Sequence, residues 1–165
     1  PLFGTPNESV STAEYLIALH VSTLIRDGGT LQIGIGALED AVTYLLKLRH
    51  GQNDLYREIL TEAGAFERFG KVIERLGGTG QFEQGLYASS EMLVDGFLEL
   101  YRSGILRRKV YQHPGLQRLL NDGRISEEVT PATLNVLVET GTISARLTPQ
   151  DFAFLQDIGI LRPGL

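Results

Sequence analysis

Residues 85–106 read GLYASSEMLVDGFLELYRSGIL, and the pattern of this stretch changes part-way along. From about Leu86 the residues are typical of a strand, which ends at Ser89-Ser90-Glu91. From Met92 to Ser103 the apolar residues recur at helical spacing, and Gly104 is a suitable end for a helix. We therefore expect a strand that passes directly into a helix, with the carboxylate of Glu91 at the junction.

A second junction of the same kind lies upstream, in residues 27–46, DGGTLQIGIGALEDAVTYLL. Alternating apolar residues predict a strand over 30–36, and the following pattern predicts a helix over 37–48. Two successive strand–helix units indicate an α/β fold. If the strands are parallel neighbours, Gly34-Ile35-Gly36 and Glu91 lie along one edge of the sheet, where ligands bind in open α/β sheets.

Helices account for much of the remaining sequence before residue 107. A helix is expected from Ser11 or Thr12 to about Arg26, and its dense apolar residues predict that it is mostly buried. Residues 54–76 are also expected to be helical, in two pieces broken near Gly64 and Gly70. We assign them to a helical insertion over 54–80 within an α/β domain that covers residues 1–106.

The segment 107–165 contains an internal repeat with a period of 18 residues. ISEEVTP at 125–131 matches ISARLTP at 143–149, so the repeat units are 125–143 and 143–161. Each unit has Thr as an N-cap, Pro at the first helical position, a short helix and a closing Gly. Two such units predict a helical hairpin, within a helical insertion that serves most simply as a packing unit.

Composition excludes several classes of function. The 165 residues carry a net charge of −5 with no Lys/Arg run longer than 107–109, so nucleic acid is not an expected partner. The chain has no cysteine, which excludes thiolate nucleophiles and Cys-based zinc sites. His20, His50 and His113 are far apart, so no metal site is expected.

No signal peptide or membrane-spanning run is found, and a cytoplasmic location is expected. Because the chain starts at Pro1 and its single methionine is Met92, we expect a piece of a longer protein.

The Gly34-Ile35-Gly36 loop has more than one interpretation. Glycines between a strand and a helix allow a phosphate to approach backbone N–H groups, but they also serve tight strand–helix packing. Glu39 stands where a dinucleotide motif has its third glycine, no Gly-Lys-Ser/Thr follows, and the acids Glu39 and Asp40 would repel a phosphate. Ser89-Ser90 lacks the Gly-x-Ser-x-Gly setting, so a serine hydrolase is disfavoured.

Both junctions resemble motifs of the acetyl-CoA hydrolase/transferase family, which includes acetyl-CoA hydrolases and the 4-hydroxybutyrate and succinate CoA-transferases. Residues 27–46 are similar to its D-G-x-x-L-Q-x-G-I-G-x-(I/L)-P-D-A-V stretch, and residues 89–106 to its (H/T/S)-(T/S)-E-M-x-x-D-G-x-x-x-L-x-x-x-G stretch. The resemblance covers residues from about 10 to 106. It implies a partial CoA-transferase-like open sheet from the second half of such a protein. Glu39 departs from the family's usual Pro, and the connection between the motifs is longer than the family pattern.

The resemblance also implies a mechanism and a set of substrates. Glu91 would be the catalytic nucleophile, forming an acyl-glutamyl anhydride and then a glutamyl-CoA thioester, while Gly34, Ile35 and Gly36 would line the acyl-CoA pocket. Coenzyme A would be a substrate and not a bound cofactor, with a small carboxylate or water as acceptor. The remainder of the parent chain and a second copy, in a homo-oligomer, would be partners, and this segment alone would be inactive.

Two other functions remain open from the sequence. The first is a non-catalytic helical protein-interaction module, in which Glu91 is an acid at a helix N-terminus. The second is a nucleotide-binding α/β domain that uses Gly34-Ile35-Gly36.

Overall fold

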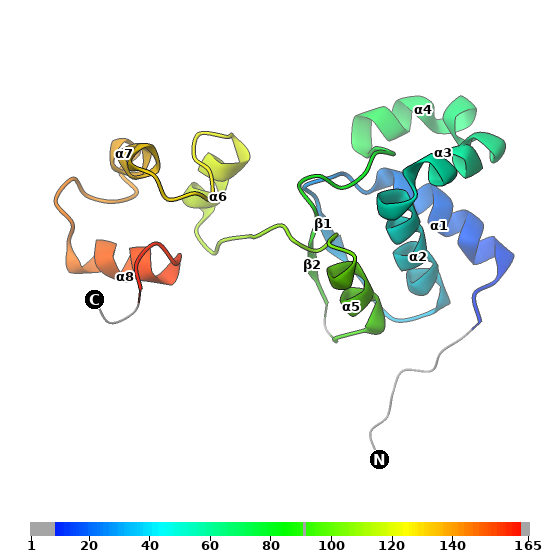
Figure 1. Ribbon diagram of the computed structural model, residues 1–165, viewed down its shortest axis with the longest axis horizontal. Helices are drawn as coiled ribbons and strands as arrows, with labels where there is room; N and C mark the ends of the chain where they lie inside the picture. Colours follow the sequence, from blue (N-terminus) through cyan, green and yellow to red (C-terminus); the bar gives the residue numbers. More distant parts are fainter. Residues whose placement is uncertain (1–8, 91, 163–165) are drawn as a thin grey trace, which may run out of the picture. The chain divides into compact units, whose positions relative to one another are not determined.

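A computed structural model describes residues 9–90 and 92–162 of the chain (Figure 1). The chain divides into two compact units, Pro1–Lys109 and Val110–Leu165. The elements of the first unit are α1 (Thr12–Leu24), β1 (Thr30–Gln32), α2 (Ala37–Gly51), α3 (Asn53–Glu62), α4 (Ala65–Leu76), β2 (Tyr87–Ser89) and α5 (Asp95–Arg102). Those of the second are α6 (Pro114–Asn121), α7 (Pro131–Glu139) and α8 (Pro149–Asp157).

The two strands of the first unit pair in parallel, so the described fold is α/β with far more helix than sheet. Thr30 pairs with Tyr87, and Gln32 pairs with Ser89. The pairing confirms the expected parallel neighbours. β1 is shorter than the predicted strand over 30–36, because its partner β2 ends at Ser89, which pairs with Gln32. Gly36, with a φ of 140°, precedes α2.

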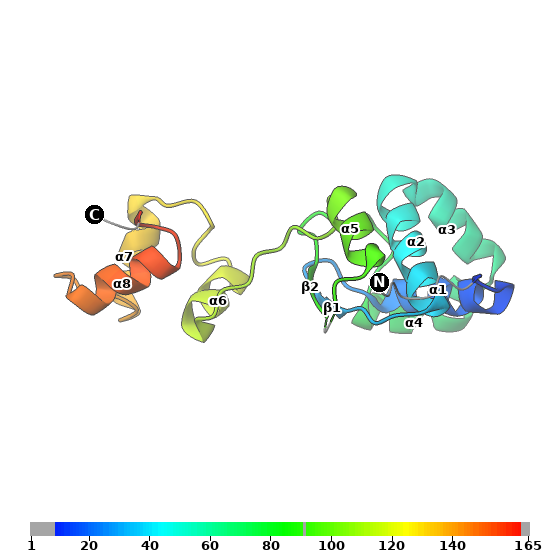
Figure 2. The same cartoon turned by 90° about the horizontal axis from the view of Figure 1, so that it is seen from below.

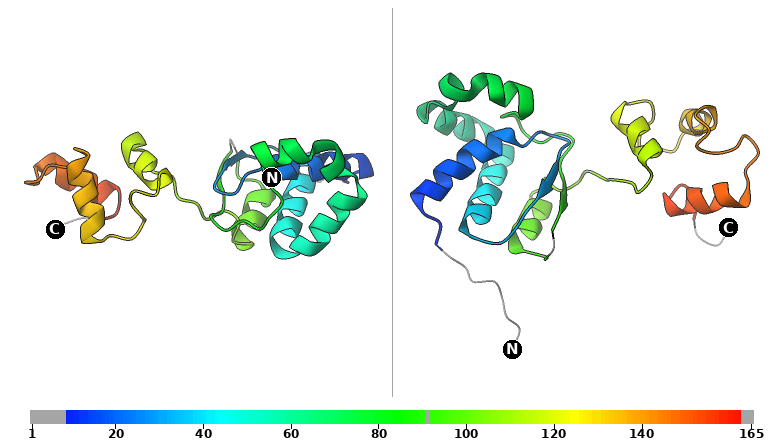
Figure 3. Two further views of the ribbon diagram at one scale, coloured as in Figure 1. Left: turned by 90° about the horizontal axis from the view of Figure 1, so that it is seen from above. Right: turned by 180° about the vertical axis from the view of Figure 1, so that it is seen from behind.

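Helices surround the sheet in two groups. Figure 2 shows α1 and α4 along one side of the first unit and α2, α3 and α5 along the other, and the left view of Figure 3 agrees. α2 is central, since it packs against α1, α3 and α5. The sheet, α2 and α5 share a core that contains Ile33, Leu46, Phe82, Leu86, Leu100 and Ile105.

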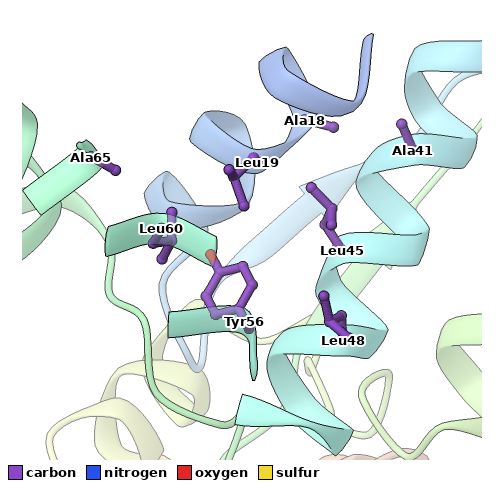
Figure 4. Packing of buried hydrophobic residues seen from close by; sticks show 8 residues of the cluster. All are labelled: Ala18, Leu19, Ala41, Leu45, Leu48, Tyr56, Leu60 and Ala65. Carbon is purple, nitrogen blue, oxygen red and sulfur yellow. The ribbon is translucent and has the colours of Figure 1, made fainter. Parts of the chain in front are cut away.

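A second core lies among α1, α2, α3 and the start of α4 (Figure 4). Its buried members are Ala18, Leu19, Ala41, Leu45, Leu48, Tyr56, Leu60 and Ala65. The buried hydroxyl of Tyr56 is satisfied by the Ser22 hydroxyl at 2.8 Å. The prediction that α1 is mostly buried is wrong for its outer face, where Leu16 and Ile17 are each half exposed, because the helices packed against α1 leave that face uncovered.

Glycine has different effects at three positions in the helical region. The expected break at Gly64 is confirmed, and this residue has a φ of 66° between α3 and α4. The expected break at Gly70 is wrong, because Gly70 lies inside α4. A helical glycine costs only about 1 kcal/mol, which the apolar face around the buried Ile73 offsets. Gly51 also lies within a helix, as the last residue of α2, and Gln52 is the C-cap of that helix.

The helix after β2 starts three residues later than the sequence pattern suggests. α5 begins at Asp95, and Val94 before it is still extended, with φ −109° and ψ 158°. Met92 and Leu93 therefore fit the helical spacing of apolar residues without being part of the helix, and both side chains are largely exposed. Gly104 ends the helix as expected, with a φ of 72°.

In the second unit, α7 and α8 occupy equivalent places 18 residues apart. Thr130 and Thr148 cap them through their hydroxyls, and Pro131 and Pro149 follow as first helical residues. In Figure 1, α7 is seen nearly along its axis while α8 lies across the view, so the two helices cross steeply. This arrangement differs from the expected hairpin.

A common helix ending links α5, α6, α7 and α8. In each, a buried leucine near the end accepts backbone hydrogen bonds from the two residues that follow a left-handed glycine. This is the Schellman geometry, and it places an Ile or Leu against the leucine. The four leucines are Leu100, Leu119, Leu137 and Leu155, and the four glycines are Gly104, Gly123, Gly141 and Gly159.

Leu137→Ala is expected to destabilise the second unit by about 2–4 kcal/mol, because Leu137 is fully buried in its core. Hydrogen exchange, read separately for residues 1–109 and 110–165, measures the effect. Leu134→Ala, on the same helix but only partly buried, is the control and should cost less than half as much. Equal loss of protection in both units would contradict the prediction, because it would show that they unfold together.

Candidate functional site

The carboxyl ends of β1 and β2 lie at the same edge of the sheet. Because Gln32 pairs with Ser89 in a parallel register, the segments that follow the two strands leave the sheet side by side. These segments are the Gly34-Ile35-Gly36 loop and the turn that begins at Ser90. The parallel register therefore places the ends of both strands at one edge of the sheet, and the position of Glu91 beside the glycine loop stays a prediction.

Ser90 connects the two segments directly. Its hydroxyl donates a hydrogen bond to the Ile33 carbonyl at 2.9 Å and accepts a longer one, 3.4 Å, from the Met92 N–H. The sequence analysis missed this role, although a Ser two residues before an exposed N–H is a known turn pattern. Glu91 itself lies outside the described residues, so its proposed role rests on its position in the chain between Ser90 and Met92.

Asp27 fixes the loop that leads into β2. One carboxylate oxygen accepts hydrogen bonds from the N–H groups of Glu83 and Gln84, each at 2.9 Å. The other accepts from Gly85 at 2.9 Å and Gly28 at 3.0 Å. A carboxylate that satisfies four backbone donors is a strong anchor. Asp27 therefore sets where β2 starts and, through it, where Ser90 lies.

Arg49 holds the same loop from the other side. Its guanidinium donates to the carbonyls of Gly80, Ser22 and Ile25 at 2.6–2.9 Å and lies 4.3 Å from the centre of the Phe82 ring. The side chain is 2% exposed, and burial lowers its pKa from the usual value. The cation thus ties the end of α1 to the loop before β2.

The glycine loop is covered by an acidic side chain. A Cβ atom on Gly36 would lie 3.0 Å from one carboxylate oxygen of Glu39, and a Cβ on Gly34 would lie 3.4 Å from the other. A negative charge therefore rests against both glycines at the start of α2. A phosphate at the same place would be repelled, which disfavours nucleotide binding through this loop.

Two hollows flank Gly34. The larger, of about 180 Å³, is lined by Gln32, Ile33, Gly34, Ile35, Ser90 and Met92. The smaller, of about 30 Å³, lies towards Thr43, whose buried hydroxyl has no hydrogen-bond partner within residues 9–90 and 92–162. That hydroxyl faces Gly96, where a Cβ would approach it to 2.8 Å. Gly96 thus allows α5 to pack closely on α2.

Each histidine has a local structural role. The His20 ring stacks edge-on with Phe69, and His113 caps α6 through Nδ1. His50 accepts the Phe82 N–H, and burial, with the Arg107 cation, lowers its pKa. Across the described ranges, no three His, Cys, Asp or Glu side chains gather as a metal site would require.

None of the helices in those ranges has the length and hydropathy needed to span a membrane.

Comparison with known proteins finds one informative similarity. The 4-hydroxybutyrate coenzyme A transferase of Clostridium kluyveri is 28% identical over 116 residues, which cover 70% of this chain. The match spans 19% of that relative, so this chain corresponds to about a fifth of it. No family model and no solved structure matches the chain. The chain is thus distantly related to a coenzyme A transferase.

Proposed function

We propose that this chain is the segment of a CoA-transferase-like enzyme that carries the catalytic glutamate, Glu91. The observation that supports the proposal most strongly is the parallel register of β1 and β2. It brings the glycine loop and the Ser90 turn to one edge, where a nucleophile and backbone donors could act on one thioester. The distant CoA transferase relative points to the same chemistry.

In the proposed reaction, the Glu91 carboxylate attacks the carbonyl carbon of an acyl-CoA. The C–S bond breaks, coenzyme A leaves as a thiolate with the electron pair, and an acyl-glutamyl anhydride forms. The thiolate then attacks the glutamyl carbonyl, which releases the acyl group as a carboxylate and leaves a glutamyl-CoA thioester. A second carboxylate takes up coenzyme A by the reverse steps, whereas water at this stage would give hydrolysis.

The glycine loop would support this reaction through its backbone. The negative charge that develops on the thioester oxygen needs preorganised donors, and N–H groups at Gly34 and Gly36 are candidates. Coenzyme A passes through as a substrate, so the proposal needs no resident cofactor. The residues of Gly34-Ile35-Gly36 are proposed to contact the acyl-CoA.

A trapping experiment tests the proposal on the full-length polypeptide that contains this chain. The protein is incubated with acyl-CoA, treated with hydroxylamine or borohydride, digested and mapped by mass spectrometry. We expect modification of the peptide that carries Glu91, retained in a Glu99→Gln variant and lost in Glu91→Gln. An adduct on another carboxylate, such as Glu39, would reject Glu91 as the nucleophile. The absence of any adduct would reject the covalent mechanism and favour a non-catalytic helical interaction module.

A further inference from the structure

The smaller hollow beside Gly34 is lined by a buried hydroxyl that has no partner. Thr43, in α2, is 6% exposed, and its Oγ1 makes no hydrogen bond within residues 9–90 and 92–162. A threonine inside a helix commonly bonds to the carbonyl one turn earlier, but this hydroxyl does not. Because an unpaired buried hydroxyl is costly, its position indicates that a small polar molecule occupies the hollow.

The size and the lining of the hollow suit one water molecule. Its volume is about 30 Å³, close to the volume that one molecule occupies in liquid water. A buried water needs two or more polar partners. Besides the Thr43 hydroxyl, the wall contains the side chains of Glu39, Asp40 and Asp95. A water that accepts from Thr43 and donates to a carboxylate would satisfy the unpaired hydroxyl.

Glu39 is the best placed of these acids to bind the water. It lies one turn before Thr43 on the same face of α2, and it is partly buried whereas Asp40 and Asp95 are exposed. Its carboxylate makes no hydrogen bond to any group in the described part of the chain. Since this carboxylate also lies against Gly34 and Gly36, it connects the hollow with the glycine loop.

The charge of Glu39 affects transfer and hydrolysis differently. In the proposed reaction, negative charge develops on a thioester oxygen beside the glycine loop, and an ionised Glu39 opposes that charge. When water is the attacking group, Glu39 can accept a proton in the same step, so the negative charge beside the loop does not double. Proline, which the family pattern has at this position, has no side-chain acceptor for a proton.

We propose that Glu39 and Thr43 hold one water molecule and that Glu39 removes a proton from it as the water attacks the glutamyl-CoA thioester. The inference rests on the proposed function, since it assumes that this thioester forms at the same edge of the sheet. It adds hydrolysis as a second outcome of the reaction, with Glu39 as general base and Thr43 as the residue that positions the water.

In this step, the water oxygen forms a bond to the thioester carbonyl carbon while one water proton passes to Glu39. The C–S bond then breaks, and coenzyme A leaves as a thiolate with the electron pair. The thiolate takes the proton from Glu39 and becomes the free thiol. The carboxylic acid formed from the glutamyl group releases its proton to the solvent, so both carboxylates are ionised again.

The test measures two rates on the full-length polypeptide. Release of free coenzyme A without an acceptor reports hydrolysis, and formation of a new thioester with a carboxylate acceptor reports transfer. Glu39→Gln should lower hydrolysis about 10²-fold or more, the usual contribution of a general base, without lowering transfer. Thr43→Val should lower hydrolysis alone by about 3- to 10-fold, and Thr43→Ser, which keeps the hydroxyl, should retain it.

Glu67→Gln is the matched control. Glu67 is the third residue of α4 and follows a glycine N-cap, as Glu39 does in α2, but it is exposed. This variant should change neither rate, so it accounts for the loss of one acid from the first turn of a helix.

Transfer without detectable hydrolysis in the unmodified protein would overturn the inference. An equal loss of both activities in Glu39→Gln, or no loss of hydrolysis, would also overturn it, because a structural role does not separate the two rates. Equal hydrolysis by Thr43→Val and Thr43→Ser would refute the water site at Thr43. If neither activity nor a trapped adduct is found with any acyl-CoA, the proposed function itself fails, and this inference with it.

Discussion

Glu91→Gln should lower kcat/KM for CoA transfer by about 10³-fold or more. The amide is nearly isosteric with the carboxylate but is not a nucleophile toward a thioester, so the anhydride cannot form. Removal of the nucleophile from other covalent enzymes has effects of this size or larger. The measurement is the rate of acyl-CoA consumption by the full-length polypeptide with a carboxylate acceptor.

Glu99→Gln provides the control for this prediction. Glu99 lies on α5, where the hydrogen bond and charge of Lys47 lower its pKa, so it is a second ionised carboxylate in the same unit. Its loss should leave the rate within about twofold, because exposed ion pairs contribute little. Glu91→Gln with more than about a tenth of the original rate would contradict the covalent mechanism, as would an equal loss in Glu99→Gln.

The local pattern of the sequence was sufficient to predict which elements form. Alternating apolar residues located β1, and the dense apolar pattern before Arg26 located α1. The sequence left open whether the two strands pair in parallel. Such pairing depends on contacts between residues 57 positions apart, which a local sequence pattern does not reveal. The ends of the elements were less predictable, because β1 stops at Gln32, where its partner strand ends, and Val94 is still extended before α5.

The repeat shows how structure extends what sequence similarity reveals. Thr-Pro at 130–131 and 148–149 marks α7 and α8, but α6 starts with His113-Pro114 and the start of α5 carries neither residue. All four helices nevertheless share the leucine and the left-handed glycine at their ends. A search for the Leu-x-x-x-Gly spacing would have found all four, because only the ending is common to them.

The candidate site was predictable in its motifs but not in its supporting contacts. Gly34-Ile35-Gly36 and the segment around Glu91 were singled out because both follow strands. The structural roles of Ser90 and Asp27 were not, since they depend on partners that only the folded chain brings together. Sequence reading therefore found the edge of the sheet and missed the side chains that shape it.

Arg49→Met is expected to lower the free energy of unfolding of the first unit by about 3 kcal/mol. Methionine keeps most of the length and apolar contact of the side chain, including its place against Phe82. It removes the donors to Ser22, Ile25 and Gly80, and leaves their carbonyls without this partner. Each buried acceptor that loses a partner costs about 1–3 kcal/mol, and partial access of water offsets part of that sum.

Arg57→Met separates this effect from a general loss of positive charge. Arg57 binds the same loop through the Thr79 hydroxyl and lies near the Phe66 ring, but it is not buried. Its substitution should cost less than about 1 kcal/mol in urea titrations. Because the loop held by Arg49 leads into β2 and Ser90, the Arg49 variant should also lose turnover at temperatures where Arg57→Met retains it. Equal stabilities of the two variants would show that the buried guanidinium does not anchor the loop.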